Sequence, residues 1–300
     1  MIDWKNVKDN TVLVVAGPTA SGKSAMALEM AAKSDGVIIN ADASQVYKGI
    51  PIISAAPSPE DKEKCLHLLY EIFDPEMRGS VAEWLSLAVK SIEQTLEEGK
   101  RPIVVGGTGF YLENLINGIS PIPDTKEEIK AQVKKIFDSG GVQALYDELL
   151  LRDPRAIKLV HANDTTRVRR ALEIFLDTGI SIAEWFEKPL RACLKGVDFQ
   201  IVAKLPPLNE LGEKCSQRFD LMLQKGGIDE VKSLLDRKLD KSLPVMKAIG
   251  VPELGAYIEG KMSLEEASNL AKLHTRQYAK RQLTWFRNRL PKLSATIFNS

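Results

Sequence analysis

The segment Thr11–Ala16 (TVLVVA), followed at once by Gly17–Ser24 (GPTASGKS), decides the fold of this chain. The apolar, β-branched run predicts a short buried strand that ends at Gly17-Pro18. The residues after it predict a helix from Lys23 to about Lys33. A G-x-x-x-x-G-K-[ST] pattern between a strand and a helix places backbone N–H groups and the helix N-terminus around an anion. The sequence therefore predicts a phosphate-binding loop, or P-loop.

The side chains of this loop also indicate phosphate chemistry. Lys23 supplies a positive charge, and the Ser24 hydroxyl is a suitable ligand for Mg²⁺, which takes one or two protein oxygens and keeps several waters. Loops of this type are common in nucleotide-binding proteins, ATP-binding ones among them. A motor or switch NTPase also needs an acid at the end of an apolar strand. Here the run Ile103–Val105 leads into Gly106–Gly109 (GGTG) without an acid, which favours a small-metabolite kinase or another transferase.

Further strands alternate with helices along the chain. The sequence predicts strands at Val37–Ala41, in the run PIVVGGTG that begins at Pro102, and at Phe199–Leu205. Between Val37–Ala41 and the run that begins at Pro102, Ser80 and Glu83 form the capping-box pattern of a helix N-terminus. Strands that alternate with helices predict a parallel sheet, and ligands then gather at the carboxyl ends of the strands.

The strand pattern stops between about residues 118 and 200, where amphipathic helical segments follow a PIPD breaker. One predicted helix opens at Asp153-Pro154, and another runs from Asn163-Asp164 to Gly179. The C-terminal third is again helical, from about residue 211 to 288. We therefore predict the α/β class, with a P-loop NTPase-like parallel sheet core formed by residues 1–117 and 201–300. An inserted all-helical domain occupies residues 118–200.

Composition limits the possible partners and the location. The 300 residues are 44% hydrophobic and 27% charged, with a formal net charge of +1, so a polyanion must be met by local basic patches. The three cysteines, Cys65, Cys193 and Cys215, are scattered, which argues against a disulfide framework or zinc site and for a reducing compartment. The N-terminal segment is no signal peptide, and no apolar run approaches the ~18 residues of a membrane span. We expect a cytoplasmic monomer.

Asp42 and Thr108 are the polar candidates at the predicted strand ends. Asp42, beside Ser44 and Gln45, ends a core strand, where a general base would face the ligand crevice. It could equally cap the next turn or serve as an outer Mg²⁺ ligand. Thr108 lies among glycines that let the backbone approach a ligand, although the same pattern fits a tight strand–helix turn.

A basic stretch near the C-terminus suggests a nucleic-acid partner. Residues 272–289 hold six Lys or Arg and no acid, and Lys272, Arg276 and Lys280 recur on one helix face. The interleaved aromatics Tyr278 and Trp285 would suit unstacked RNA bases. Taken alone, this pattern also fits a solvated helix face with its aromatic residues in the core. Arg167 and Arg170 form a weaker pair near a predicted helix N-terminus.

Together these stretches resemble one family, the tRNA dimethylallyltransferases, also called tRNA isopentenyltransferases. The motifs that carry the resemblance are GPTASGKS, NADASQVYKG, PIVVGGTGFYL, NDTTRVRRALE, PVMKAIGVPEL and RQYAKRQLTWFR, and they cover almost the whole chain. The resemblance implies transfer of a dimethylallyl group from dimethylallyl diphosphate to the exocyclic amine of the adenosine 3′ of the anticodon in tRNA. Diphosphate then leaves with Mg²⁺. No zinc-finger tail of the eukaryotic members follows, which favours the bacterial type.

The resemblance also assigns roles to residues. The catalytic set is Asp42 as general base, Thr108 as a contact to the adenosine, and Lys23. The residues implied for diphosphate binding are Gly17, Thr19, Ala20, Ser21, Gly22, Lys23 and Ser24, with Ser24 also on the metal. The residues implied for tRNA binding are Asp42, Ala43, Ser44, Gln45, Thr108, Thr166, Arg167, Val168, Arg169, Arg170, Arg276, Lys280 and Arg281.

Some positions depart from the family pattern. Leu208 and Lys214 stand where arginines are usual, and Ala56 replaces a lysine. The cation that completes the diphosphate site is therefore left open, with Lys214 and Arg218 as candidates. None of these changes affects Asp42, Lys23, Ser24 or Thr108, so we predict an active enzyme.

Three other functions stay open at this point. A small-molecule kinase would use ATP, and an adenylate isopentenyltransferase would prenylate a free nucleotide. A non-enzymatic RNA-binding protein is the third. The helical insert and the basic C-terminal stretch favour tRNA as the acceptor, because a free nucleotide needs neither.

Overall fold

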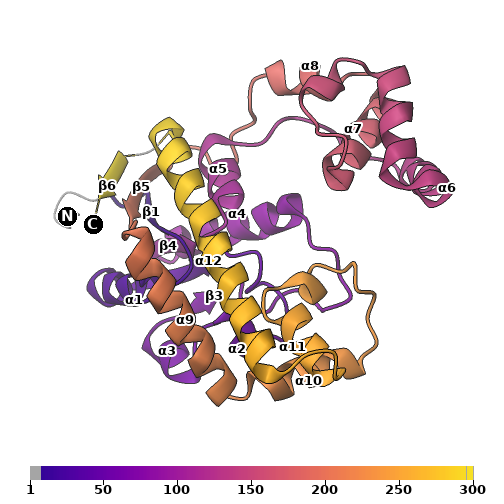
Figure 1. Cartoon of the computed structure of the whole chain (residues 1–300). Helices are drawn as coiled ribbons and strands as arrows, with labels where there is room; N and C mark the ends of the chain where they lie inside the picture. Colours follow the sequence, from indigo (N-terminus) through magenta and orange to yellow (C-terminus); the bar gives the residue numbers. More distant parts are fainter. Residues whose placement is uncertain (1–7, 295, 300) are drawn as a thin grey trace. The chain divides into compact units, whose positions relative to one another are not determined.

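The computed structural model describes residues 8–294 and 296–299, and this part of the chain confirms the α/β class. Its strands form one parallel sheet of six in the order β3-β2-β4-β1-β5-β6 (Figure 1). The strands are β1 (Thr11–Ala16), β2 (Gly36–Asn40), β3 (His67–Leu68), β4 (Arg101–Gly106), β5 (Asp198–Ala203) and β6 (Thr296–Asn299). β1, β2, β4 and β5 match the four predicted strands to within about two residues at each end. The short β3 and β6 were not predicted.

The described chain divides into two compact units, Met1–Asn117 with Cys193–Ser300 and Gly118–Ala192. The second boundary falls before the predicted residue 200, because β5 begins at Asp198 and pairs with β1 in the sheet of the first unit. The helices of the first unit are α1 (Lys23–Ser34), α2 (Pro51–Ser54), α3 (Pro59–Lys64), α4 (Val81–Glu97), α5 (Gly109–Asn117), α9 (Leu208–Gln224), α10 (Gly227–Asp236), α11 (Val251–Ile258) and α12 (Leu264–Arg289).

The sheet is buried on both faces. On one face, Leu13, Ile38 and Ile103 pack with Ala27 and Met30 of α1. The alternate residues of the central strands, such as Val14 and Val104, are also fully buried, and α4 packs against β2 and β4. Burial on both faces explains the nearly continuous apolar runs that identified these strands. The predicted capping box of α4 is present, because Glu83 N–H donates to Ser80 Oγ at 3.1 Å.

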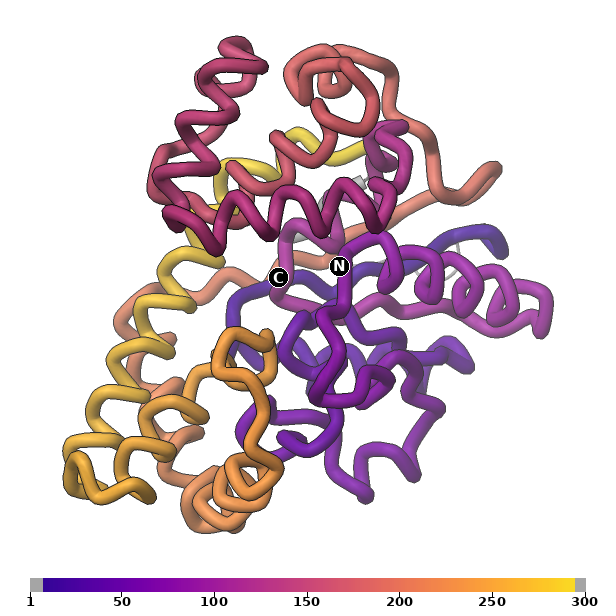
Figure 2. Tube along the Cα trace, turned by 90° about the vertical axis from the view of Figure 1, so that its right-hand side faces the viewer, coloured from indigo at the N-terminus to yellow at the C-terminus, as the bar shows by residue number. Residues whose placement is uncertain are grey.

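Helices α9 and α12 lie side by side and can be followed along the traces of Figures 1 and 2. Leu211 and Cys215 of α9 pack with Ala279 of α12, and Ala20 of the P-loop packs against this cluster. An ion pair of 2.5 Å between Lys272 and Asp220 also joins the two helices. Residues far apart in the sequence therefore hold the P-loop from one side.

The second unit is all-helical. It contains α6 (Glu127–Arg152), a 3₁₀ turn η2 (Ala156–Lys158), α7 (Thr165–Thr178) and α8 (Ile182–Glu187) around a small apolar core. The predicted start and end of α7 are confirmed, with Asp164 as N-cap and Gly179 in the left-handed region at its C-terminus. The helix predicted at Asp153-Pro154 is only the turn η2.

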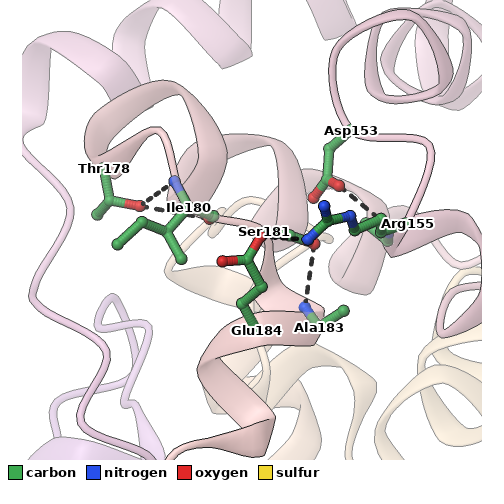
Figure 3. A network of polar contacts seen from close by, with 8 residues as sticks. Asp153, Arg155, Thr178, Ile180, Ser181, Ala183 and Glu184 are labelled. Atoms are coloured by element: carbon green, nitrogen blue, oxygen red, sulfur yellow. Dashed lines mark hydrogen bonds and ion pairs between the residues drawn. The ribbon is translucent and has the colours of Figure 1, made fainter.

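Polar contacts close the loops of this unit (Figure 3). Asp153 accepts a hydrogen bond of 3.3 Å from Ala156 N–H, and Ser181 accepts one of 3.2 Å from Ala183 N–H at the start of α8. Arg155 donates to Glu184 at 2.6 Å. These short-range contacts fix the turns on both sides of α7. In the described part of the chain, no helix is long and apolar enough to cross a membrane.

Candidate active site

The P-loop leaves β1 at the carboxyl edge of the sheet, between β4 and β5. Ala20 and Gly22 both have positive φ angles, 60° and 85°, which turn neighbouring N–H groups to one side as in an anion-binding nest. Thr19 N–H donates to Gln282, and Ser21 N–H to Pro18 O. Among the described residues, nothing accepts a hydrogen bond from the N–H groups of Gly22, Lys23 or Ser24. These groups at the start of α1 are available to an anion.

Lys23 is buried within the loop, with 9% of its surface exposed, and its Nζ lies 3.5 Å from Pro18 O. Burial lowers the pKa of Lys23 to about 8, since it penalises the charged form. The Asp42 carboxylate raises the pKa, and the Arg218 guanidinium lowers it further. The ammonium therefore lies in a dry, positively charged environment, which a bound phosphate would stabilise.

The two candidate cations of the predicted diphosphate site, Arg218 and Lys214, differ in their distance from the P-loop. Arg218 of α9 reaches the P-loop and donates to Thr19 Oγ1, and burial lowers the pKa of its guanidinium. Lys214 is exposed, and its Nζ lies 4.0 Å from Glu210 on the same helix. Arg218 is thus brought to the predicted site, and Lys214 pairs on the helix surface.

The serines of the loop differ in their surroundings. Ser24 is exposed at the start of α1, whereas Ser21 Oγ is buried and has no hydrogen-bond partner. Within residues 8–294 and 296–299, no group of three or more His, Cys, Asp or Glu could hold a metal. A single hydroxyl that shares a metal with ligand oxygens and water fits the habits of Mg²⁺. Ser24 is in a position to be that ligand.

Asp42 follows β2 at the same edge of the sheet and is 7% exposed. Its Oδ1 accepts hydrogen bonds from Ser44 N–H at 3.0 Å and Ser44 Oγ at 2.6 Å. Its backbone N–H donates to Asn40 Oδ1 at 2.9 Å. No described residue donates a hydrogen bond to Oδ2, so one carboxylate oxygen is fixed and the other is available to a substrate proton.

The neighbours of Asp42 shape this loop. The Gln45 amide donates to the carbonyl oxygens of Ser54 and Ala55 at 3.0 and 2.7 Å, which ties the loop to the end of α2. Ala43 N–H donates to Thr108 Oγ1 at 2.9 Å. Thr108 therefore lies directly beside the Asp42 loop.

Helix α12 closes the site with one face. Gln282, which is 6% exposed, accepts from Thr19 N–H at 2.8 Å and donates to Gly107 O at 2.9 Å. Burial raises the pKa of the Tyr278 phenol, and hydrogen bonds with Thr108 and Gln282 lower it in part. Gln282 and Tyr278 thus connect the P-loop with the turn that carries Thr108.

This packing explains the glycines of the GGTG turn. A Cβ at Gly107 would lie 2.5 Å from Gln282 Nε2, and a Cβ at Gly109 would lie 2.2 Å from the Trp285 ring. Any larger residue would push α12 away from the turn. The close approach of Gln282 and Trp285, in the motif RQLTWF, is therefore possible only because the turn GGTG has glycine at these two positions.

Comparisons with known proteins agree with this geometry. A family model described as IPP transferase matches residues 45–289. The chain belongs to the IPP transferase family. A tRNA dimethylallyltransferase from Zymomonas mobilis is 41% identical over 292 residues, which cover 97% of this chain and 92% of that protein. One from Rhodopseudomonas palustris is 41% identical, with 93% of this chain and 87% of that protein covered.

Solved structures of this family are similar to the chain as well. A tRNA isopentenylpyrophosphate transferase from Bacillus halodurans has 34% identity and a TM-score of 0.66, covering 97% of this chain and 90% of that chain. A eukaryotic dimethylallyltransferase described as acting on tRNA has 30% identity and a TM-score of 0.85, with 97% and 74% covered. The predicted family and the P-loop NTPase-like fold are confirmed.

The IPP transferase family match begins after Asp42, but the longer alignment does include the site. An alignment of 292 residues in a chain of 300 must contain both the P-loop and Asp42. The catalytic candidates therefore lie within the aligned region of a relative at 41% identity.

Three of the basic residues predicted on α12 are exposed, and a fourth is held in an ion pair. Arg276 lines a shallow groove of about 500 Å³ with Leu208, Gly212 and Ser216 of α9. Lys280 and Arg281 are exposed, and the Arg281 guanidinium lies 5.7 Å from the centre of the Tyr278 ring. These three cations are accessible, whereas Lys272 is paired with Asp220.

The predicted tRNA-binding segment of the helical unit has two sides. Thr166 and Arg167 are exposed in the first turn of α7. Val168 is fully buried in the core of the unit, so its side chain is not available to RNA. Arg169 lies over the Phe137 ring at 4.9 Å, and Arg170 donates to Thr125 at 2.6 Å. Of the five predicted residues, the structure therefore excludes only Val168 from a contact with RNA, and the Arg170 side chain is 41% exposed in spite of its hydrogen bond.

Gln282 is the main site residue that residue-by-residue sequence analysis missed. Its motif RQYAKRQLTWFR was recognised, but the emphasis fell on the basic and aromatic residues of that stretch. A signal was present, because an uncharged amide four residues after Tyr278 lies on the same helix face. No pattern in the sequence indicates that the partner of this amide is Thr19, which is 263 positions away.

We expect Gln282→Met to lower the stability of the first unit. The substitution keeps the side-chain size but leaves Thr19 N–H and Gly107 O without partners, which costs about 2 kcal/mol. In calorimetry, this corresponds to a fall in Tm of roughly 4–8 °C.

Gln277→Met is the matched control, because Gln277 is exposed on the same helix. It should leave Tm within about 1 °C of the wild type. Equal Tm values for the two variants would show that the Gln282 bridge does not hold the site together.

Proposed function

We propose that this protein transfers the dimethylallyl group of dimethylallyl diphosphate to the exocyclic amine of the adenosine next to the anticodon in tRNA, releasing diphosphate. The observation that carries the proposal is the arrangement of the sheet edge. The P-loop, with its available N–H groups, follows β1, and Asp42, with its available Oδ2, follows β2. An anion cradle and a proton acceptor thus face one crevice.

The P-loop would stabilise the leaving group. As the C–O bond to the diphosphate breaks, negative charge grows on the departing oxygen. The N–H groups of Gly22 and Ser24, and the Lys23 ammonium, are fixed before that charge appears, and such preorganised donors contribute several kcal/mol. The Ser24 hydroxyl would be a ligand of Mg²⁺, and the ion would supply further positive charge to the leaving group.

Asp42 would act as the base. The adenine amine nitrogen forms the new bond to the allylic carbon, and one of its protons moves to Asp42 Oδ2. Oδ1 is held by Ser44, so the carboxylate stays oriented during the step. Thr108, whose Oγ1 is tied to the Asp42 loop, would orient the adenine. Proton transfer in the transition state by a positioned group contributes about 10²–10⁴-fold to the rate.

The tRNA would be held mainly by exposed cations. Arg276, Lys280 and Arg281 of α12, and Arg167 of α7, are accessible for phosphate contacts. The target base must leave its stack, which costs a few kcal/mol that these contacts have to offset. Because the substrate is tRNA, we also propose that the protein is cytoplasmic. We propose in addition that it acts as a monomer.

A free adenine nucleotide is the alternative acceptor. The test is to incubate the protein with labelled dimethylallyl diphosphate and Mg²⁺, together with unmodified tRNA, AMP or ATP in turn. We expect label on tRNA alone. Label on AMP or ATP but not on tRNA would replace the proposal with a nucleotide prenyltransferase, and conversion of ATP to ADP, followed in the same mixture, would replace it with a kinase.

Replacement of Asp42 tests the base. Asp42→Asn keeps an oxygen that can accept from Ser44 but removes the proton acceptor, so we expect kcat to fall by about 10²–10⁴-fold. The affinity for tRNA, measured by filter binding, should stay within about threefold of the wild type. Asp74→Asn, at an exposed ion pair with Lys48, is the control for loss of a carboxylate. Full activity of Asp42→Asn would remove Asp42 as the base.

The lowered pKa of Lys23 predicts a pH dependence of diphosphate binding. Only the protonated amine attracts the anion, and burial places its pKa at about 8 in the free protein. Affinity for dimethylallyl diphosphate should therefore fall as the pH rises through 8, by about tenfold between pH 7 and 9. Calorimetric titration without tRNA measures it.

Lys23→Arg is the control for this profile, because arginine stays protonated over the whole range. The phosphate groups of the ligand titrate in the same way with Lys23→Arg and with the wild type. A difference between the two pH profiles is therefore caused by the titration of Lys23. An equally steep fall in Lys23→Arg would assign the pH dependence to another group.

A further inference from the structure

Lys204 lies against the P-loop although it is outside every motif named so far. It directly follows β5, and its backbone N–H donates to Ala16 O at 2.8 Å. Its carbonyl oxygen would lie 2.5 Å from a Cβ at Gly17. The backbone of Lys204 is thus fixed beside the first residue of the loop.

The side chain of Lys204 runs along the loop to its far end. Nζ would lie 3.4 Å, and Cε 3.6 Å, from a Cβ at Gly22. Gly22 is the residue immediately before α1, and its N–H is one of those without an acceptor among the described residues. The Lys204 ammonium is therefore beside the helix N-terminus that makes up the anion cradle.

The ammonium has no carboxylate partner there. Among the ion pairs of the described chain, none includes Lys204, and no described residue accepts a hydrogen bond from its Nζ. Glu29 of α1 is influenced by its charge, but Glu29 Oε1 is paired with Lys33 at 2.5 Å. A cation at a helix N-terminus is opposed by the helix dipole. The position is unfavourable in the empty protein and becomes favourable when an anion binds.

We propose that Lys204 binds the diphosphate, with its Nζ on an oxygen of the phosphate group that extends out of the P-loop. The proposal rests on the proposed function, in which this loop holds a diphosphate. Lys204 would then supply a cation from the segment in which Leu208 and Lys214 replace the arginines expected from the family pattern. Lys214 itself pairs with Glu210, whereas Lys204 is unpaired and in contact with the loop.

The experiment is calorimetric titration of the full chain with inorganic pyrophosphate and Mg²⁺. Lys204→Met removes the charge but keeps the length of the side chain. A charge-assisted hydrogen bond is worth roughly 1.5–3 kcal/mol, so we expect Kd to rise by at least about tenfold. Lys204→Arg should stay within about threefold of the wild type, because the charge is kept.

Lys33→Met is the matched control, because it removes the same charge from the other end of α1 and its partner is Glu29. It should bind pyrophosphate as the wild type does. In the transfer assay, Lys204→Met should raise KM for dimethylallyl diphosphate by at least about tenfold and leave KM for tRNA unchanged. A melting curve that matches the wild type shows that the variant is folded.

The outcomes separate this inference from the proposed function. Weaker pyrophosphate binding by Lys204→Met, with no transfer by the wild type to tRNA, would keep Lys204 as an anion ligand and remove the proposed reaction. Equal binding by Lys204→Met and the wild type would overturn the role of Lys204 and leave the reaction standing. A wild type that does not bind pyrophosphate would overturn both.

Discussion

The site depends on one buried amide, that of Gln282, which bridges two loops that the sheet alone does not hold together. Its oxygen accepts from Thr19 N–H and its nitrogen donates to Gly107 O. A hydrogen bond inside a protein is worth most when both groups would otherwise be buried without partners. The P-loop and the turn that carries Thr108 are therefore set at a fixed separation by α12, the helix that also exposes Arg276, Lys280 and Arg281.

Burial of positive charge around the loop has a cost in the empty protein. Lys23 is almost fully buried, and Arg218 beside it is largely desolvated, so burial lowers the pKa of both groups. Asp42 offsets part of this repulsion for Lys23 and for Arg218. In the proposed reaction a bound diphosphate would supply the compensating negative charge, so the repulsion that destabilises the free site would strengthen diphosphate binding.

Local patterns in the sequence predicted much of this structure, and long-range contacts were the part that they could not predict. The strand before the P-loop, the capping box of Ser80 and Glu83, and the ends of α7 at Asp164 and Gly179 all depend on residues a few positions apart. Thr19 and Gln282 are 263 positions apart, and no periodicity links them. β3, with two residues, is too short for a pattern, and the short turn after Asp153 resembled a helix start in sequence.

The orientation of Asp42 shows how the two kinds of contact combine. Asn40 and Ser44, two residues to either side, fix its backbone and one carboxylate oxygen. Beyond them, Gln45 holds the end of α2, and Glu230 of α10 accepts from the N–H groups of Ile52 and Ile53 at its start, at 2.7 and 3.0 Å. The short helix α2 is therefore held at both ends, once from the Asp42 loop and once from α10. A general base must stay aligned with its proton to within about 0.5 Å, and this clamp would let Asp42 meet that requirement in the proposed reaction although it lies in a loop.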